Sequence, residues 1–195
     1  MAKSAVSAEE STRLRALRAL EILDTPDEER FDRYTRLAQR LFGTPVALLS
    51  LVDETRLWFK SAVGMGVREI PRQFSFCGHA ILGLDVMVVQ DAREDGRFER
   101  NPLVTGEPYI RFYAGAPVHA PAGEAIGNLC VIDFAPRAFS HEDLTLLATL
   151  AELVEHEFGA ACPVPLSDAQ QAVYESLLDE ADIREALSGA LSERA

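Results

Sequence analysis

The chain has 195 residues, 48% of them apolar, and a formal net charge of -12 at pH 7. The length suits one ordinary domain, and the apolar share is enough for a substantial core. The acidic balance argues against nucleic acid or an anionic membrane surface as a partner, because both are bound through basic patches.

Targeting features and cysteine usage indicate a cytoplasmic protein. No apolar run reaches the ~20 residues of a membrane span, and the N-terminus has no apolar signal-peptide core. The three cysteines, Cys77, Cys130 and Cys162, are an odd number in a chain large enough to fold without disulfides. That usage favours a reducing compartment.

The N-terminal part predicts two helices. From residue 8 to Leu23, apolar side chains recur mostly three or four positions apart, which predicts an amphipathic helix. The turn at residues 24–27 ends this helix, because the residue before a proline is pushed out of helical space. A second amphipathic helix follows and ends at Gly43.

The middle of the chain predicts a sheet. The apolar run 46–52 is typical of a buried strand, and 56–63 is its return strand after a short turn. Residues 110–118 and 125–133 form a second pair with a turn of hairpin length. Short turns favour antiparallel pairing over a βαβ series, so the sequence predicts an α+β fold with an antiparallel sheet.

The C-terminal part predicts two more helices. Ser140 is expected to cap a helix that runs to about Phe158. A proline-containing linker follows, and a weaker apolar pattern over residues 167–191 predicts a last amphipathic helix. We therefore divide the chain into a tail with the start of the first helix (1–15), a central domain (16–160), and a linker with the last helix (161–195).

The stretch from Phe74 to Ile81 is the strongest candidate for a functional site. It places the Cys77 thiol, a flexible Gly78 and the His79 imidazole together. Cys77 is a candidate nucleophile, chromophore attachment point or metal ligand, and a helix start there would favour its thiolate. The alternative is a small buried hydrophobe at Cys77, with His79 as a loop cap. One Cys-x-His pair supplies only two ligands, so we expect no metal.

Eight short motifs in order resemble the GAF family, in particular its bacterial subfamily found with histidine kinases and diguanylate cyclases. The resemblance runs from about Ala16 to Phe158. The motifs are Leu23-Asp24-Thr25-Pro26, Ser50-Leu51-Val52-Asp53, Trp58-Phe59-Lys60-Ser61, Phe76-Cys77-Gly78-His79-Ala80-Ile81, Asp91-Ala92-Arg93, Asn101-Pro102, Arg111-Phe112-Tyr113-Ala114-Gly115 and Gly127-Asn128-Leu129-Cys130-Val131-Ile132-Asp133. The resemblance implies a PAS-related antiparallel sheet of about six strands, with helices on one face and a ligand pocket under loops on the other. It also implies dimerisation through the terminal helices.

Alternation along the strand 56–63 suggests a first group of pocket residues. It turns Trp58 and Lys60 to one face and Phe59 to the other. An aromatic ring and an amine on the pocket face would suit a planar anionic ligand. A tryptophan in a strand is more often part of the core, so both interpretations stay open.

The later motifs supply a second group. If the resemblance holds, Arg111, Tyr113 and Asn128 line the same concavity. A buried unpaired guanidinium is costly, so Arg111 either meets a ligand or pairs with a carboxylate. The candidate carboxylates are Asp53, Asp91 and Asp133. Asp91 also belongs, with Arg93, Asp95 and Asn101, to an irregular stretch of the kind that often carries function. The ligand-binding residues we expect are Trp58, Lys60, Phe76, Cys77, His79, Asp91, Arg111, Tyr113 and Asn128, and we expect no catalytic residue.

The sequence lacks the signatures of several known GAF subgroups, which disfavours their ligands and activities for this chain. The Asn-Lys…Phe…Asp-Glu signature of cyclic-nucleotide-binding members is absent, which disfavours cyclic GMP or AMP. The element 77–80 resembles free methionine sulfoxide reductases, but no cysteine follows between residues 89 and 107 to resolve a sulfenic acid. Cys130 would serve only if the fold brings its Cα within ~7 Å of that of Cys77. Bilin-binding members have a histidine directly after the attaching cysteine, where Gly78 stands, so bilin is disfavoured.

We therefore expect a non-catalytic sensory or regulatory module of bacterial signal transduction, as in two-component systems. It would bind an unidentified small molecule or sense redox through Cys77. The expected assembly is a homodimer whose output passes to a signalling partner protein. The alternatives are a thiol-dependent reductase of the free methionine sulfoxide reductase type and a protein-interaction module without a small ligand. No cofactor is identified.

Overall fold

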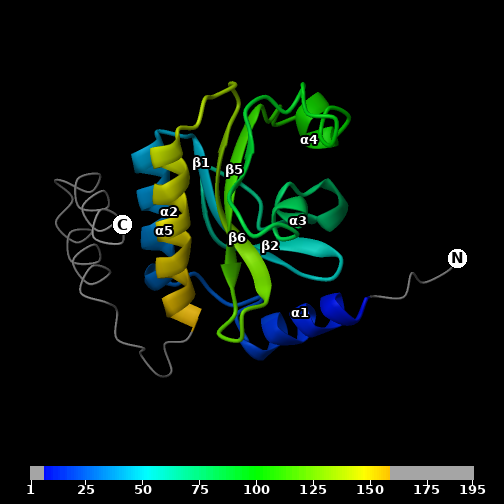
Figure 1. Cartoon of the computed structure of the whole chain (residues 1–195), viewed down its shortest axis with the longest axis vertical. Coiled ribbons are helices and arrows are strands. Elements are labelled where there is room, and N and C mark those ends of the chain that lie inside the picture. The colour runs from blue at the N-terminus through cyan, green and yellow to red at the C-terminus, as the bar shows by residue number, and fades with distance from the viewer. Residues whose placement is uncertain (1–6, 159–195) are drawn as a thin grey trace, which may run out of the picture.

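The computed structural model describes residues 7–158, which form one antiparallel sheet between two unequal layers (Figure 1). The strand order is β3-β2-β1-β6-β5-β4. The strands are β1 (Val46–Val52), β2 (Arg56–Val63), β3 (Glu69–Pro71), β4 (Met87–Val89), β5 (Phe112–His119) and β6 (Ala125–Asp133). The helices are α1 (Ala8–Ala19), α2 (Glu29–Phe42), α3 (Cys77–Ala80), α4 (Pro102–Thr105) and α5 (His141–Phe158), with a 3-10 turn η1 (Arg72–Phe74). The long helices α2 and α5 cover one face, and α3, α4 and their connections cover the other (Figure 1).

The central strands contribute to two separate hydrophobic cores. Along β1, Leu49 and Leu51 pack beneath α2 and α5, whereas Leu48 and Val52 pack beneath the connections on the other side. Burial on both faces explains why β1 is a continuous apolar run instead of an alternating one. We call the side under α2 and α5 the helix-covered face, and the side under α3 and α4 the loop-covered face.

A β-bulge between β1 and β2 sets the direction of two polar side chains. The register shifts between Leu49 and Ser50, which leaves Lys60 as the extra residue of β2. Lys60 and Ser61 are both buried, and both bond to groups on the helix-covered side. Ser61 Oγ, for example, donates to Asp32 Oδ1 of α2 at 2.5 Å.

A charged cluster ties α1 to the turn η1. Arg13 donates to both carboxylate oxygens of Glu10, at 2.8 and 2.7 Å. Arg72 Nη1 donates to Glu10 Oε1 at 2.5 Å and to the Asp53 carbonyl at 3.1 Å. The hydrogen bonds from Arg13, with those from Arg72, lower the pKa of Glu10 from 4.5 to about 2.

This shift predicts a pH-dependent contribution of Glu10 to stability. A folded-state pKa below the unfolded value stabilises the protein above pH 4.5, and the contribution is lost as the pH falls through about 2. We expect Glu10→Gln to lower the urea midpoint at pH 7, and the gap to the parent protein to shrink by roughly half or more between pH 6 and pH 3. Glu9→Gln, an exposed change on the same helix, is the matched control. A gap of constant size at every pH would contradict the assignment.

The predicted class, antiparallel sheet and one-sided helical cover are confirmed. Two details differ. α1 ends at Ala19, before Leu23, because Glu21 adopts a left-handed backbone with φ of 52°. β3 was not predicted, because three residues are too few to show alternation. The predicted helix over 167–191 lies outside the described residues. No helix within residues 7–158 is long and apolar enough to cross a membrane.

Candidate functional site

Four buried polar residues meet beneath α3 in the loop-covered face. Cys77 begins α3, Tyr113 lies on β5, and Asn128 and Cys130 lie on β6. The two sulfur atoms are 3.8 Å apart, and the Tyr113 hydroxyl donates to Cys77 Sγ at 3.3 Å. Asn128 Nδ2 donates to the Cys77 carbonyl at 3.1 Å. All four are at most 2% exposed, and we call them the Cys77 cluster.

Asn128 holds an unused acceptor in this cluster. Its Nδ2 is bonded, but its Oδ1 is buried and has no hydrogen-bond partner among the described residues. Leaving a buried acceptor without a donor costs about 1–3 kcal/mol. The Oδ1 atom is therefore the group in the cluster best suited to accept a hydrogen bond from a bound molecule.

Gly115 on β5 leaves the space that the Tyr113 ring occupies. Gly115 is two residues along from Tyr113, so both lie on the same face of the strand. A Cβ atom added at Gly115 would lie 2.1 Å from the Tyr113 hydroxyl oxygen. The missing side chain therefore lets the tyrosine lie along its own strand and reach Cys77.

The hydrogen bonds of the cluster shift the pKa values of the two thiols in opposite directions. Burial raises the pKa of Cys77, but hydrogen bonds from Cys130 and Tyr113, with a contribution from the nearby Ser50 hydroxyl, outweigh it, so this pKa lies below its ordinary value. The hydrogen bond to Cys77 raises the pKa of Cys130 well above the ordinary value, and burial adds to it. Burial also raises the pKa of Tyr113, which therefore keeps its proton and remains a donor. Cys77 is the thiol of the pair that can act as a thiolate.

Aromatic rings cover the cluster. Phe76 stacks on Phe98 with ring centroids 4.1 Å apart, and on Tyr113 at 5.3 Å. The exposed His79 meets Phe98 edge-on at 5.0 Å. Asn101 Nδ2 donates to the last carbonyl of η1 at 2.9 Å and so joins the Phe98 segment to the chain before α3. Phe76 and His79 thus belong to the cover of the cluster.

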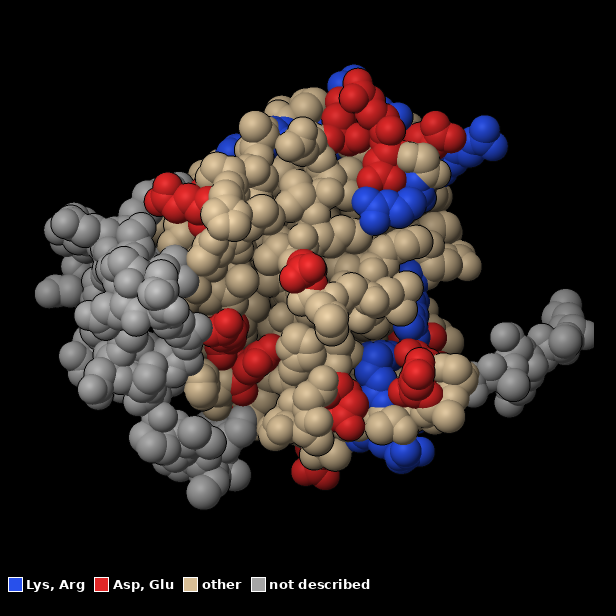
Figure 2. All heavy atoms as spheres, viewed as in Figure 1, with Lys and Arg blue, Asp and Glu red and all other residues tan. Residues whose placement is uncertain are grey.

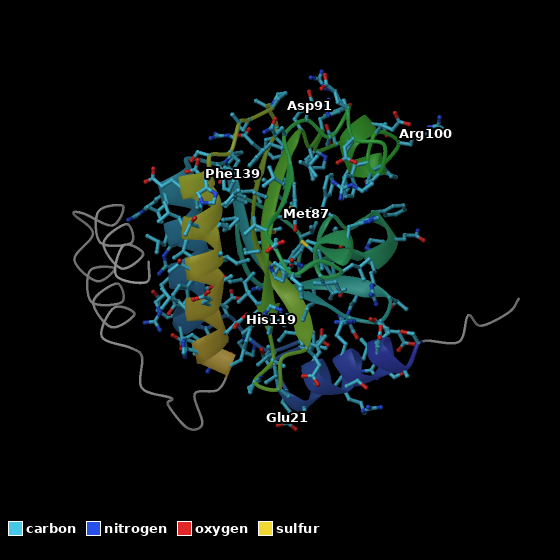
Figure 3. The ribbon with its side chains drawn as sticks, in the orientation of Figure 1. Glu21, Met87, Asp91, Arg100, His119 and Phe139 are labelled. Carbon is cyan, nitrogen blue, oxygen red and sulfur yellow. The ribbon has the colours of Figure 1, made fainter. Side chains whose placement is uncertain are left out.

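Asp91 and Arg111 lie at the rim of the loop-covered face. Asp91 accepts from the backbone and side chain of Arg93, whose guanidinium lowers the pKa of Asp91 to about 2. Arg111 Nη1 donates to the Val104 and Ile110 carbonyls at 2.9 and 3.0 Å. Within residues 7–158, Arg111 forms no ion pair with the three carboxylates proposed for it. Figure 3 shows Asp91 at the edge of the fold, and Figure 2 shows charged side chains gathered above and below a largely uncharged middle.

Trp58 and Lys60 lie on the opposite side of the sheet from the Cys77 cluster. They share a face, as alternation predicts, but it is the helix-covered one, so the expected pocket-facing orientation is corrected. Trp58 joins the core beneath α2 and α5. Lys60 Nζ donates to Thr25 Oγ1 and the Pro26 carbonyl and pairs with Glu28. The argument for a planar anionic ligand rested on these two side chains and no longer applies.

Two cavities lie away from the Cys77 cluster. One of about 570 Å³ lies between α5, β5 and the residues before β4, with His119 and Glu155 in its wall. The other, of about 360 Å³, is lined by residues around Gly66. In the described part of the chain, the place expected for a pocket beneath the loops is packed with Phe76, Phe98 and Tyr113.

Two residues of the site were missed by the sequence analysis. Ser50 interrupts the apolar run of β1, its hydroxyl donates to the Asn128 carbonyl at 3.2 Å, and its side chain helps to lower the pKa of Cys77. A lone hydroxyl in a fully buried strand is the signal that could have found it. Phe98 is a buried aromatic residue within a polar stretch, and that contrast is its signal.

Comparison of the sequence with models of known protein families shows which family the chain belongs to. The model of the GAF domain matches residues 27–158, which is more than half of the chain and includes every strand and the whole Cys77 cluster. The chain belongs to the GAF family. A sensory or regulatory role is what this membership supports.

Individual relatives of this GAF chain were found both by sequence and by structure. A cyclic di-GMP phosphodiesterase of Pseudomonas aeruginosa is 39% identical over 163 residues, covering 83% of this chain but only 28% of the relative. The chain thus spans less than a third of that protein. Among solved structures, a free methionine-R-sulfoxide reductase of Neisseria meningitidis is 18% identical with a TM-score of 0.56, covering 83% of this chain and 94% of the other. A GAF domain of an Acinetobacter phosphoenolpyruvate-protein phosphotransferase is 20% identical with a TM-score of 0.54, covering 80% and 98%. At these identities the structures show the shared fold alone.

Proposed function

We propose that this GAF chain is a non-catalytic sensory module that binds a small molecule at the Cys77 cluster. The observation that carries the proposal is the buried Asn128 Oδ1 atom without a donor. Buried polar groups in proteins nearly always have a partner, so an unused acceptor beside stacked rings supports a ligand there. A small planar molecule with an N–H or O–H group fits this chemistry, and it would enter as Phe98 moves aside.

The signalling context rests on the similarity to the Pseudomonas aeruginosa protein. The match to a cyclic di-GMP phosphodiesterase covers a minor part of that protein, as expected for a regulatory module joined to an effector. We extend this to a cytoplasmic role in bacterial signalling, of the kind served by GAF modules found with histidine kinases and diguanylate cyclases. The output partner would then be such an effector.

The proposed signal passes through the terminal helices of a homodimer. A ligand shifts the population between two helix arrangements only if it binds one of them better. α3 contacts β1, β5 and β6, and β6 in turn contacts α1 and α5, so a path of packed elements joins site and helices. Analytical ultracentrifugation tests the dimer, and we expect a concentration-dependent dimer mass. A chain that stays monomeric at every accessible concentration would remove this mechanism.

A second candidate function is thiol-dependent reduction of a small sulfoxide. The 3.8 Å distance between the sulfur atoms favours it, because Cys130 could resolve a sulfenic acid on Cys77. The burial of Cys77 opposes it, because a substrate must reach the sulfur. The assay is turnover of free methionine sulfoxide with a thiol reductant, compared with Cys77→Ser. Turnover that disappears in the variant would establish the enzyme, and none with Cys77 reduced would exclude it.

A further inference from the structure

We propose that Cys77 and Cys130 are a reversible disulfide site that fastens α3 to the central strand β6 when a small peroxide oxidises the protein. The two sulfurs are in contact at 3.8 Å, and one belongs to a four-residue helix while the other belongs to the sheet. The inference does not depend on ligand binding. Its test measures only the oxidation state of the two cysteines, so the disulfide proposal and the small-molecule proposal can fail independently.

Formation of the disulfide requires a small movement of α3 or of β6. An S–S bond is on the order of 2 Å long, so the sulfurs must approach by roughly 2 Å. Cys130 is fixed by pairing of β6 with β1 and β5 on both sides. α3 is a single helical turn whose following residues include Leu82 and Leu84, which are 79% and 91% exposed. We therefore expect α3 to move toward the sheet.

The chemistry uses the two thiols unequally. The Cys77 thiolate, stabilised by the Tyr113 hydroxyl donor, attacks one oxygen of hydrogen peroxide, the O–O bond breaks, and hydroxide leaves. The Cys130 thiol then attacks the sulfenic sulfur, its proton is lost, and water is released. Two thiols and one peroxide thus give one disulfide and two waters. A thiol reductant reverses the bond by exchange.

The burial of the pair determines which oxidants can act. Cys77 is 2% exposed and Cys130 is fully buried behind the stacked rings of Phe76 and Phe98. A molecule the size of peroxide needs only small openings of this cover to reach the sulfur, whereas a larger thiol or disulfide reagent needs wider openings and therefore reacts more slowly. The same burial slows the approach of other thiols to the sulfenic acid, so Cys130, already in contact with Cys77, reacts with it first.

The experiment uses the full chain carrying Cys162→Ser, which removes the third cysteine of the sequence. After hydrogen peroxide treatment and quenching, the denatured intact mass should fall by the mass of two hydrogens. Digestion with trypsin in the absence of reductant should release the peptides 73–93 and 112–137 joined by the disulfide. Dithiothreitol should then separate them. The melting temperature should rise on the order of 5 °C on oxidation, because the bond closes a long loop.

Matched variants assign the reaction to the pair. Cys130→Ala should gain the mass of oxygen on Cys77 without any link, and Cys77→Ala should gain far less. The parent protein alone decides the outcome even if a variant folds poorly. Oxygen addition on Cys77 without a linked peptide, a link between two chains, or an unlinked and unoxidised cysteine pair at peroxide levels that already oxidise the half-buried Met65 and Met87 would each overturn the proposal.

Discussion

Gly127→Ala is expected to destabilise the protein by at least about 3 kcal/mol, the largest effect of any single methyl group we predict. Gly127 lies on β6 opposite Leu51 of β1. A Cβ atom there would lie 2.0 Å from the Ser50 carbonyl oxygen, which is backbone of the neighbouring strand and cannot rotate away. The two central strands would have to separate, and Ser50 and Asn128 of the site would move with them.

Gly66→Ala is the matched control for this change. A Cβ atom at Gly66 meets nothing within 4 Å, and its backbone is not left-handed. We expect a change within about 0.5 kcal/mol, or a small gain because alanine restricts the unfolded chain. Urea unfolding of both variants provides the measurement. Equal stabilities for the two variants would show that the β1–β6 contact is looser than the structure has it.

Lys60→Ala is expected to cost roughly 3 kcal/mol of unfolding free energy. The Lys60 side chain is fully buried, and its Nζ contacts Thr25 Oγ1 at 2.6 Å, the Pro26 carbonyl at 2.9 Å and Glu28 Oε1 at 2.5 Å. Truncation leaves those acceptors without their donor and opens a cavity beneath α2. Glu28 is half-exposed and can turn to water, which limits the loss.

Two further variants divide the contributions of Lys60. Lys60→Met keeps most of the volume and removes the charge, so we expect a smaller loss of about 1–2 kcal/mol. Arg100→Ala is the control for deleting a cationic side chain, since Arg100 is 93% exposed and projects from the rim (Figure 3). Its effect should stay within about 0.5 kcal/mol. If Lys60→Ala were as mild as Arg100→Ala, the buried network would have no stabilising role.

The sequence predicted the site best where motif order and strand pairing agree. Cys77, Tyr113 and Asn128 come from three separate motifs, and antiparallel pairing brings them within hydrogen-bond distance. The proximity of Cys130 to Cys77 was stated only as a condition, because the sequence does not give the distance between two elements. The structure supplies the sulfur separation directly.

The sequence failed where a face of the sheet had to be chosen. Alternation tells that Trp58 and Lys60 share a face, but it does not tell which layer covers that face. The bulge after Leu49 also turns Lys60 and Ser61 to the same side, which strict alternation forbids. Arg111 was expected to pair with a carboxylate or a ligand, and instead the backbone carbonyls of Val104 in α4 and of the adjacent Ile110 accept its hydrogen bonds.

The small-molecule proposal is tested most directly by comparing the mass of the purified chain under native and denaturing conditions. Binding at the Cys77 cluster predicts extra mass per chain that is lost on denaturation and is much reduced in Asn128→Leu, which removes the Oδ1 acceptor. Melting curves of the variant serve as the folding control. A bare chain mass under native conditions, before and after incubation with a small-molecule extract of bacterial cells, would contradict the sensor and favour the interaction module.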